Sequence, residues 1–187
     1  ALNSAQNLFD TIADLQTLAM IQMGQDIPLS KTNLLEEAAT AISMAKNGAD
    51  KKGIEIKTSI PSINVNANPV LLRSVIQNLV NNAVKFSFPG KSVIVSAENL
   101  KKDRITISVT DYGRGMTTDE ISSLFQGKAV VSYTGTVQEP GAGVGLMNCQ
   151  KILEIFHGKI WAESDGEGQG SKFSFSIPLA PHETKKE

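Results

Sequence analysis

The sequence predicts an α+β fold, a two-layer sandwich in which helices pack on one face of a mixed, mostly antiparallel sheet, with one further helix at the N-terminus. Three observations carry this prediction: long amphipathic helical patterns early in the chain, strand-sized alternating runs joined by short polar loops, and a late helix followed by two more strands. Helices and strands therefore fall in segregated groups, without the regular alternation of a parallel sheet. A chain of 187 residues with 41% hydrophobic content can bury one main core.

Two helical patterns occupy the first 51 residues. Apolar residues at steps of three and four make a narrow seam over residues 5–22, of the kind that packs against another helix. Glycine and proline interrupt this pattern, so residues 24–30 are expected to be a linker. A second amphipathic helix is expected over residues 33–51, with Gly53 beyond its end.

The remaining elements alternate between strand and helix signals. Residues 54–60 have the period of a strand with one buried face. Asn68 and Pro69 form a cap and a first-turn proline, which predict a helix to about Phe86. The later elements are an antiparallel pair of strands over 92–98 and 104–110, a helix over about 144–156, and strands over 159–163 and 172–177.

Composition narrows the class of partner. The formal net charge is -1 with both signs mixed along the chain, so we expect no nucleic acid partner. No apolar run approaches the ~20 residues that cross a bilayer, so we expect no membrane contact by this piece. The single cysteine, Cys149, fits a reducing, cytoplasmic setting and is expected to pack inside a helix layer.

Three polar side chains follow one face of the helix expected over residues 69–86. Asn78, Asn82 and Lys85 stand at i, i+4 and i+7, so they can converge on one point at the edge of the core. Asparagine is a mediocre helix former, and a face chosen for solubility would more naturally carry Glu, Lys or Gln. Two amide oxygens can join the shell of Mg²⁺, and an ammonium can meet phosphate oxygens. Taken alone, a solvated or capping face explains the stripe equally well.

Two glycine-containing segments follow. Asp111 comes directly after a strand and precedes Gly113 and Gly115, where a carboxylate can accept a hydrogen bond from an exocyclic amine and backbone can approach a planar ring. By itself this segment is explained more simply as an Asp/Gly turn. Residues 141–145 place three glycines before a helix, where free N–H groups and the helix dipole favour phosphate. Their spacing matches neither the Walker loop nor the dinucleotide fingerprint.

Taken together and in this order, the three segments resemble a known superfamily. Asn-x3-Asn-x2-Lys-Phe, Asp-x-Gly-x-Gly-Met and Gly-x-Gly-x-Gly-Leu are similar to the motifs of the ATPase superfamily of gyrases, heat-shock chaperones, histidine kinases and mismatch-repair proteins, which has the Bergerat fold. Within it, residues 78–86, 157–161 and 170–173 resemble the catalytic, ATP-binding domain of sensor histidine kinases. The resemblance extends to about Leu179.

The resemblance implies ATP and Mg²⁺ as ligands and a role for each motif residue. Asn78 and Asn82 would bind Mg²⁺, Lys85 would lie near the phosphates, and Asn78 with Lys85 would make up the catalytic set. Asp111 would read adenine. The other contacts that it implies are Phe86 in the adenine pocket; Gly113, Gly115 and Met116 beside Asp111; Gly141, Gly143, Val144, Gly145 and Leu146 at the end of a mobile lid over residues 126–140; Lys128 within that lid; and Ser171 on the adenine side.

Two departures from the wider pattern bear on activity. Members that hydrolyse ATP carry Glu at the position of Asn78, and an amide cannot act as that base, so the resemblance implies transfer to a histidine in place of water. The His-Glu/Asp-x-Arg-x-Pro acceptor pattern does not occur, and neither His157 nor His182 stands in one. We therefore expect a fragment whose acceptor lies on a helix elsewhere. The alternative is a nucleotide-binding regulatory module, such as an anti-sigma-factor-like serine kinase or a pseudokinase.

The resemblance also implies domain boundaries and partners. Residues 1–25 would be the C-terminal part of a dimerisation and phosphotransfer helix, residues 26–180 the ATP-binding domain, and residues 181–187 a disordered tail. The expected partners are the histidine-bearing helices of the parent kinase, the receiver domain of a response regulator, and a second copy of the chain through the N-terminal helix. The parent protein could be anchored in a membrane.

Overall fold

The computed structural model describes residues 27–101, 103–125, 136 and 145–181. Its main sheet has five strands in the order β2-β4-β5-β7-β6. β2 pairs in parallel with β4, and the other neighbours are antiparallel, so the sheet is mixed as predicted. The strands are β2 (Glu55–Ser59), β4 (Ser92–Lys101), β5 (Arg104–Asp111), β6 (Lys159–Glu163) and β7 (Ser171–Pro178).

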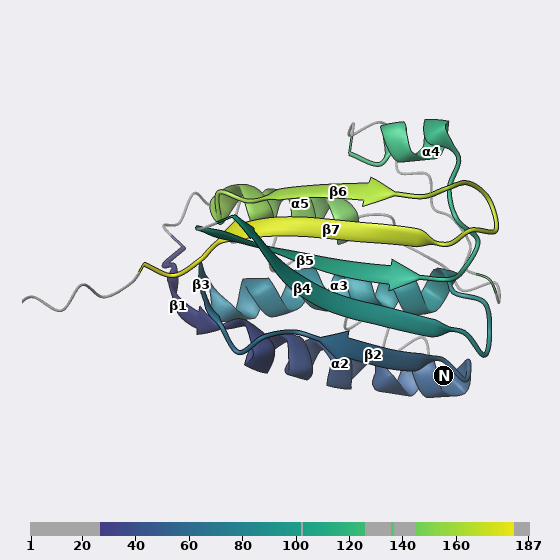
Figure 1. Ribbon diagram of the computed structural model, residues 1–187, viewed down its shortest axis with the longest axis horizontal. Helices are drawn as coiled ribbons and strands as arrows, with labels where there is room; N and C mark the ends of the chain where they lie inside the picture. Colours follow the sequence, from purple (N-terminus) through teal and green to yellow (C-terminus); the bar gives the residue numbers. More distant parts are fainter. Residues whose placement is uncertain (1–26, 102, 126–135, 137–144, 182–187) are drawn as a thin grey trace, which may run out of the picture.

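Three helices cover one face of this sheet, which confirms the α+β prediction (Figure 1). They are α2 (Leu34–Lys51), α3 (Pro69–Phe86) and α5 (Gly145–Ile155), and α3 packs between the other two. The expected cap is present at Asn68, whose side chain accepts from Val70 N at 3.1 Å. Asn33, expected as the first helical residue, is instead the cap of α2 and accepts from Leu35 N at 3.0 Å. The short helix α4 (Thr118–Ser123) stands at one end of the sheet.

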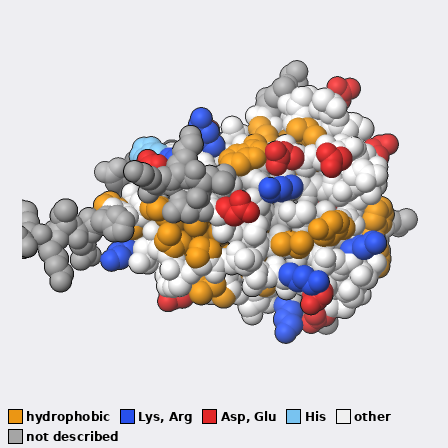
Figure 2. Space-filling model, in the orientation of Figure 1, with side chains coloured by type: hydrophobic (Ala, Val, Ile, Leu, Met, Phe, Trp, Pro, Cys, Tyr) orange, Lys and Arg blue, Asp and Glu red, His pale blue; other side chains and the backbone are white. Residues whose placement is uncertain are grey.

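The core lies between the helices and the sheet and is centred on α3. Fully buried aliphatic side chains come from both layers, and burying each stabilises the fold by about 1.5–3 kcal/mol. Cys149 is also buried here, as expected for a small packing residue. Typical core members are Leu72, Ile76 and Leu79 of α3, Ile152 of α5, Ile105 and Ile107 of β5, and Phe175 of β7. On the side of the molecule seen in Figure 2, charged side chains of both signs are interspersed with hydrophobic ones.

Three short elements were not predicted. β1 (Ser30–Asn33) and β3 (Asn64–Ala67) form a separate two-stranded antiparallel sheet, so the expectation of a linker over residues 24–30 is wrong at Ser30. The helix α4 is the third. The strand β2 is also shorter than expected and mostly exposed, because it lies at the edge of the sheet and only Ile56 among its side chains turns toward the core.

Some expectations lie outside the described residues. These are the N-terminal helix, the tail over residues 182–187, and all of the proposed lid except Thr136. In the part of the chain that is described, no helix combines the length and apolar character that crossing a bilayer requires.

Candidate functional site

The polar stripe on α3 is half-buried and faces the start of α5. Asn78, Asn82 and Lys85 are all half-buried, while the opposite side of the helix packs into the core. Gly145 begins α5 directly beside Asn78, because a Cβ added at Gly145 would overlap the Oδ1 atom of Asn78. The first and third sequence motifs therefore meet in space, and glycine at position 145 leaves the room that the Asn78 amide occupies.

Asp111 ends β5 as a buried carboxylate. Its side chain is 3% exposed and accepts a hydrogen bond from Gly113 N at 3.0 Å. The register of β5 with β7 places Ser171 opposite Asp111. Burial raises the pKa of Asp111 to about 6, although backbone hydrogen bonds from Gly113 and Ser171 act in the other direction. A buried carboxylate with unused accepting capacity suits a neutral donor such as an exocyclic amine.

The glycine loop after Asp111 lies tightly against the end of α3. A Cβ at Gly113 would overlap the carbonyl oxygen of Phe86, and Arg114 N donates to that same oxygen at 3.1 Å. Gly115 has a φ of 67° and leaves no space for a side chain against Gly166 O. The second motif therefore meets the first at the C-terminal end of α3.

Residues between β6 and β7 hold this loop from the other side. Met116 is 7% exposed, and its N–H donates to the Ser164 hydroxyl at 3.0 Å. That hydroxyl donates to Gly170 O at 2.7 Å. The chain between β6 and β7 thus holds the loop through Met116, and Ser171 at the start of β7 lies opposite Asp111.

The remaining predicted positions divide into two groups. Leu146 is half-buried and packs on the core in the first turn of α5. Gly141, Gly143, Val144 and Lys128 lie outside the described residues. His157 follows α5 in the left-handed region, with a φ of 52°, where its N–H donates to Glu154 O. This agrees with a role in ending the helix.

Sequence reasoning missed a charged network around Phe86. The Lys85 ammonium lies 4.8 Å from the centre of the Phe86 ring, and the Arg114 guanidinium lies 5.9 Å from it. Glu120 pairs with Arg114 and accepts from Thr117 N at 2.8 Å. Burial acts to raise the pKa of Glu120, but the hydrogen bonds from Thr117 and Arg114 outweigh it and lower that pKa, so the pair stays charged. The Thr-x-x-Glu spacing of a capping box was the available signal.

The donor set fits a hard cation held with a nucleotide better than a protein-only metal centre. Within the described ranges, no group of three or more His, Cys, Asp or Glu side chains could hold a metal ion. Asn78 and Asn82 instead offer amide oxygens, which suit Mg²⁺ when substrate phosphates supply further oxygens. Glycine at position 145 allows the Asn78 amide to lie against the start of α5.

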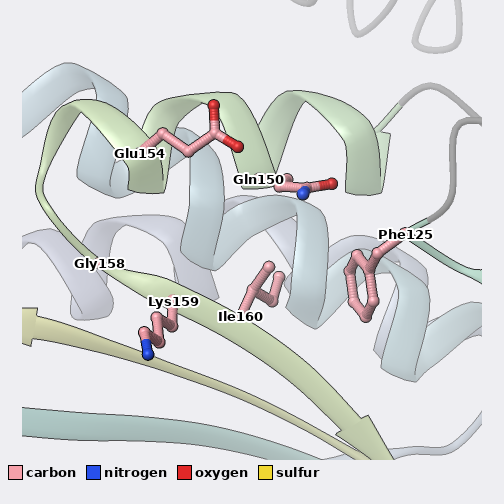
Figure 3. A pocket seen from close by; sticks show the side chains of 6 residues that line it. All are labelled: Phe125, Gln150, Glu154, Gly158, Lys159 and Ile160. Carbon is pink, nitrogen blue, oxygen red and sulfur yellow. The ribbon is translucent and has the colours of Figure 1, made fainter.

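A separate pocket of about 280 Å³ lies between α5 and the edge strand β6. Figure 3 shows Gln150 and Glu154 on the helix, Lys159 and Ile160 on the strand, and the Phe125 ring at one end. None of the residues predicted for the site lines it. Its mixed lining gives no chemical reason to connect it with the motif residues.

Curated relatives of the chain are sensor kinases. The chain is 34% identical over 151 residues to the adaptive-response sensory kinase SasA of Prochlorococcus marinus, an alignment that covers 80% of this chain and 39% of that protein. It is 27% identical over 191 residues to the sensor protein GacS of Pseudomonas syringae pv. syringae, covering 98% of this chain and 21% of that protein. The chain therefore spans about two fifths or less of the length of these relatives.

Solved structures share the fold. The full-length structure of ShkA in complex with AMPPNP superposes with a TM-score of 0.76 at 25% identity, covering 95% of this chain and 37% of that one. The catalytic domain of histidine kinase ThkA superposes with a TM-score of 0.70 at 24% identity, covering 82% and 97%. The sequence profile of the histidine kinase-, DNA gyrase B- and HSP90-like ATPases matches residues 67–181, which contain all three motifs. With its motifs gathered around α3 in this way, the chain belongs to that ATPase family.

Proposed function

We propose that residues 26–180 form the ATP-binding catalytic domain of a two-component sensor histidine kinase. The observation that carries the proposal is that α3 meets both glycine motifs: its middle adjoins Gly145 through Asn78, and its last turn adjoins Gly113 through Phe86. A nucleotide that spans from Asp111 to Gly145 would lie along the polar stripe of this helix. The AMPPNP in the full-length structure of ShkA supports a nucleotide as the ligand.

Each motif residue has a task in this proposal. The Asp111 carboxylate accepts a hydrogen bond from the adenine amine, and the glycine backbone at 113 and 115 lets the ring approach. Phe86 supplies an apolar contact at the pocket edge. The remaining adenine-side contacts are Met116 and Ser171, and the phosphate-side contacts are Lys128, Gly141, Gly143, Val144, Gly145 and Leu146.

Positioning and charge do most of the work in phosphoryl transfer. Asn78 and Asn82 would hold Mg²⁺ through their side-chain oxygens, and the ion would neutralise phosphate charge. Lys85 extends from the last turn of the same stripe, and its long side chain would bring an ammonium to the phosphates. Because Asn78 is an amide, it cannot take a proton from water, which disfavours hydrolysis. The γ-phosphoryl instead forms a bond to an imidazole nitrogen as its bond to the bridging oxygen of ADP breaks.

The acceptor and partners belong to the parent protein in this proposal. Residues 1–25 would be the end of a dimerisation and phosphotransfer helix, and residues 181–187 a tail. The acceptor histidine would lie on helices of the parent kinase, and a response-regulator receiver domain would take the phosphoryl group next. We further propose that the domain works in the cytoplasm and that the N-terminal helix can pair two copies.

The decisive experiment combines binding with transfer. ATP binding is measured by calorimetry for the unaltered chain, for Asp111→Asn, and for Asp103→Asn, in which an exposed aspartate outside the site is changed. We expect Asp111→Asn alone to abolish binding. The chain is then mixed with a histidine-bearing helical hairpin and labelled ATP, and acid-labile, base-stable phosphate on the hairpin is expected. Equal affinity for all three proteins, or label found only on serine of a partner, would overturn the proposal.

A further inference from the structure

The lysine that follows α2 reaches the C-terminal end of α3, the helix that carries Lys85. Lys52 follows the last residue of α2, and its ammonium lies 2.8 Å from Val84 O, 2.7 Å from Lys85 O and 2.9 Å from the Thr136 hydroxyl. An ammonium has three N–H groups, so three acceptors at these distances match its full donor capacity. Lys52 is half-buried, which strengthens such charge-assisted hydrogen bonds.

The last three carbonyl groups of α3 are bound from outside the helix, while that of Ala83 accepts from the C-cap residue Ser87 at 2.9 Å. Carbonyls of a helix's last turn have no intrahelical donor. Here Lys52 binds those of Val84 and Lys85, while Arg114 N binds that of Phe86. Lys85 O also accepts from Thr136 N at 3.2 Å. The last turn of α3 is therefore held from α2, from the Asp111 loop and from Thr136 together.

Thr136 completes this arrangement from a distant part of the sequence. Its hydroxyl accepts from Lys52 and donates to Ser87 O at 2.6 Å. Lys52 binds the carbonyls of Val84 and Lys85, and Thr136 binds those of Lys85 and Ser87. Together they hold the backbone before and after Lys85. The backbone from which the Lys85 side chain extends thus has a fixed position, and contact with the Phe86 ring restricts the ammonium at the other end.

We infer that Lys52 is a positioning residue for phosphate binding, which acts by fixing the backbone of Lys85. The inference rests on the proposed function, in which Lys85 meets the phosphates. A long lysine side chain loses rotamer freedom when it binds a phosphate. If the backbone of Lys85 is already fixed, only its side chain has to be ordered on binding, which lowers the entropic cost. A displacement of about 1 Å at such a site can cost up to about 100-fold in rate.

An ordinary helix cap is the competing explanation, because a cation near a helix C-terminus is stabilising without any functional role. The two explanations differ in what they predict for ligands. A cap that only stabilises α3 would affect adenosine and ATP alike, since both use the Asp111 end of the site. A positioning residue would affect ATP alone, since only ATP has phosphates for Lys85 to bind.

The test compares Lys52→Met with Lys51→Met in the whole chain. Lys51 is the neighbouring exposed lysine in the last turn of α2, and among the described residues the structure gives its side chain no partner. Dissociation constants for ATP and adenosine are measured by calorimetry, and folding is followed by circular dichroism. We expect Lys52→Met to weaken ATP about tenfold with adenosine changed less than about twofold, and Lys51→Met to change neither.

A double-mutant cycle with Lys85→Met makes the mechanism explicit. If Lys52 acts through Lys85, adding Lys52→Met to Lys85→Met should cause no further loss of ATP affinity. Thr136→Val gives a second route, with a smaller loss confined to ATP, if Lys52→Met folds poorly. Lys52→Arg should restore part of the affinity.

Equal losses for both ligands, or additive losses in the cycle, would overturn the inference and leave Lys52 as a cap. Failure of the unaltered chain to bind ATP would instead overturn the proposed function on which the inference rests. The two failures are therefore distinguishable.

Discussion

The buried carboxylate of Asp111 should make stability depend on pH and, under the proposed function, nucleotide binding as well. Its pKa is raised from 3.8 to about 6 in the folded protein. The native state therefore binds a proton more tightly than the unfolded chain, so the stabilisation from this group is fully present below about pH 4 and is lost as the pH rises through about 6. By linkage, this group adds about 1 kcal/mol to the free energy of unfolding at pH 5 compared with pH 7.5, and about 2 kcal/mol at pH 4.

This contribution can be isolated with Asp111→Asn, whose amide does not titrate. Urea unfolding of both proteins at about pH 5 and pH 7.5 should show that the difference between their free energies of unfolding changes by about 1 kcal/mol, with the unaltered chain relatively more stable at the lower pH. All other titrating groups cancel in this comparison. A difference that stays constant with pH would refute the raised pKa.

Under the proposed function, nucleotide binding should have the opposite pH dependence, because the adenine amine would donate to the ionised carboxylate. Affinity for adenosine should fall about tenfold from pH 7.5 to pH 5, where about one molecule in eleven has Asp111 ionised. Binding at pH 5 should therefore release about one proton per adenosine, and binding at pH 7.5 almost none. Adenosine is the appropriate ligand because it has no phosphate whose titration would overlap. Calorimetry in two buffers of different ionisation enthalpy counts the protons. A constant affinity without proton release would contradict the assignment of Asp111 to the amine.

Other changes have separable consequences. Gly145→Ala places a methyl group against Asn78 Oδ1, so calorimetry should show ATP binding at least tenfold weaker. Because alanine suits a helix, urea unfolding should show the free energy of unfolding fall by less than about 1 kcal/mol. Unchanged ATP affinity would contradict the contact between Gly145 and Asn78. Glu120→Gln removes the charge paired with Arg114 and should lower the free energy of unfolding by about 1 kcal/mol, a loss that high salt should reduce; a neutral effect in low salt would argue against the pair. Ile152→Ala leaves a cavity beneath α5 and should lower the free energy of unfolding by about 2–5 kcal/mol in the same assay, with a smaller value ruling out tight packing there.

Most of the fold followed from local signals. Asn68 marked a helix start because its side chain can cap free N–H groups, and the structure has this cap. The antiparallel pair β4 and β5 followed from alternation and a short loop. β1 and β3 gave no such signal, because four residues contain too little alternation and their partners lie 37 residues apart at Ser30 and Ala67. Strand order also depends on long-range pairing that periodicity does not encode.

The candidate site, like the fold, could be predicted only in part from the sequence. Spacing placed Asn78, Asn82 and Lys85 on one side of α3, and the order of motifs suggested that Asp111 and Gly145 belong with them. The contact of Gly145 with Asn78 depends on how α5 packs on α3, which no spacing reveals. Lys52 and Thr136 bind the same carbonyl group from distant parts of the sequence, and neither residue has a local signature. Tertiary packing therefore supplied what the sequence pattern could not.

The pairing of β1 with β3 fixes the point at which the preceding chain joins the domain. Asn68, the cap of α3, donates from its side chain to Pro28 O at 3.4 Å, so the chain enters beside the first turn of this helix. The 18 residues of α3 extend about 27 Å, and Asn78 lies about halfway along the helix. Under the proposed phosphotransfer, a histidine tethered ahead of Ile27 has to cross about half of this span or come from a second molecule. Signalling could then be regulated by reach alone, without any alteration of the groups that bind ATP.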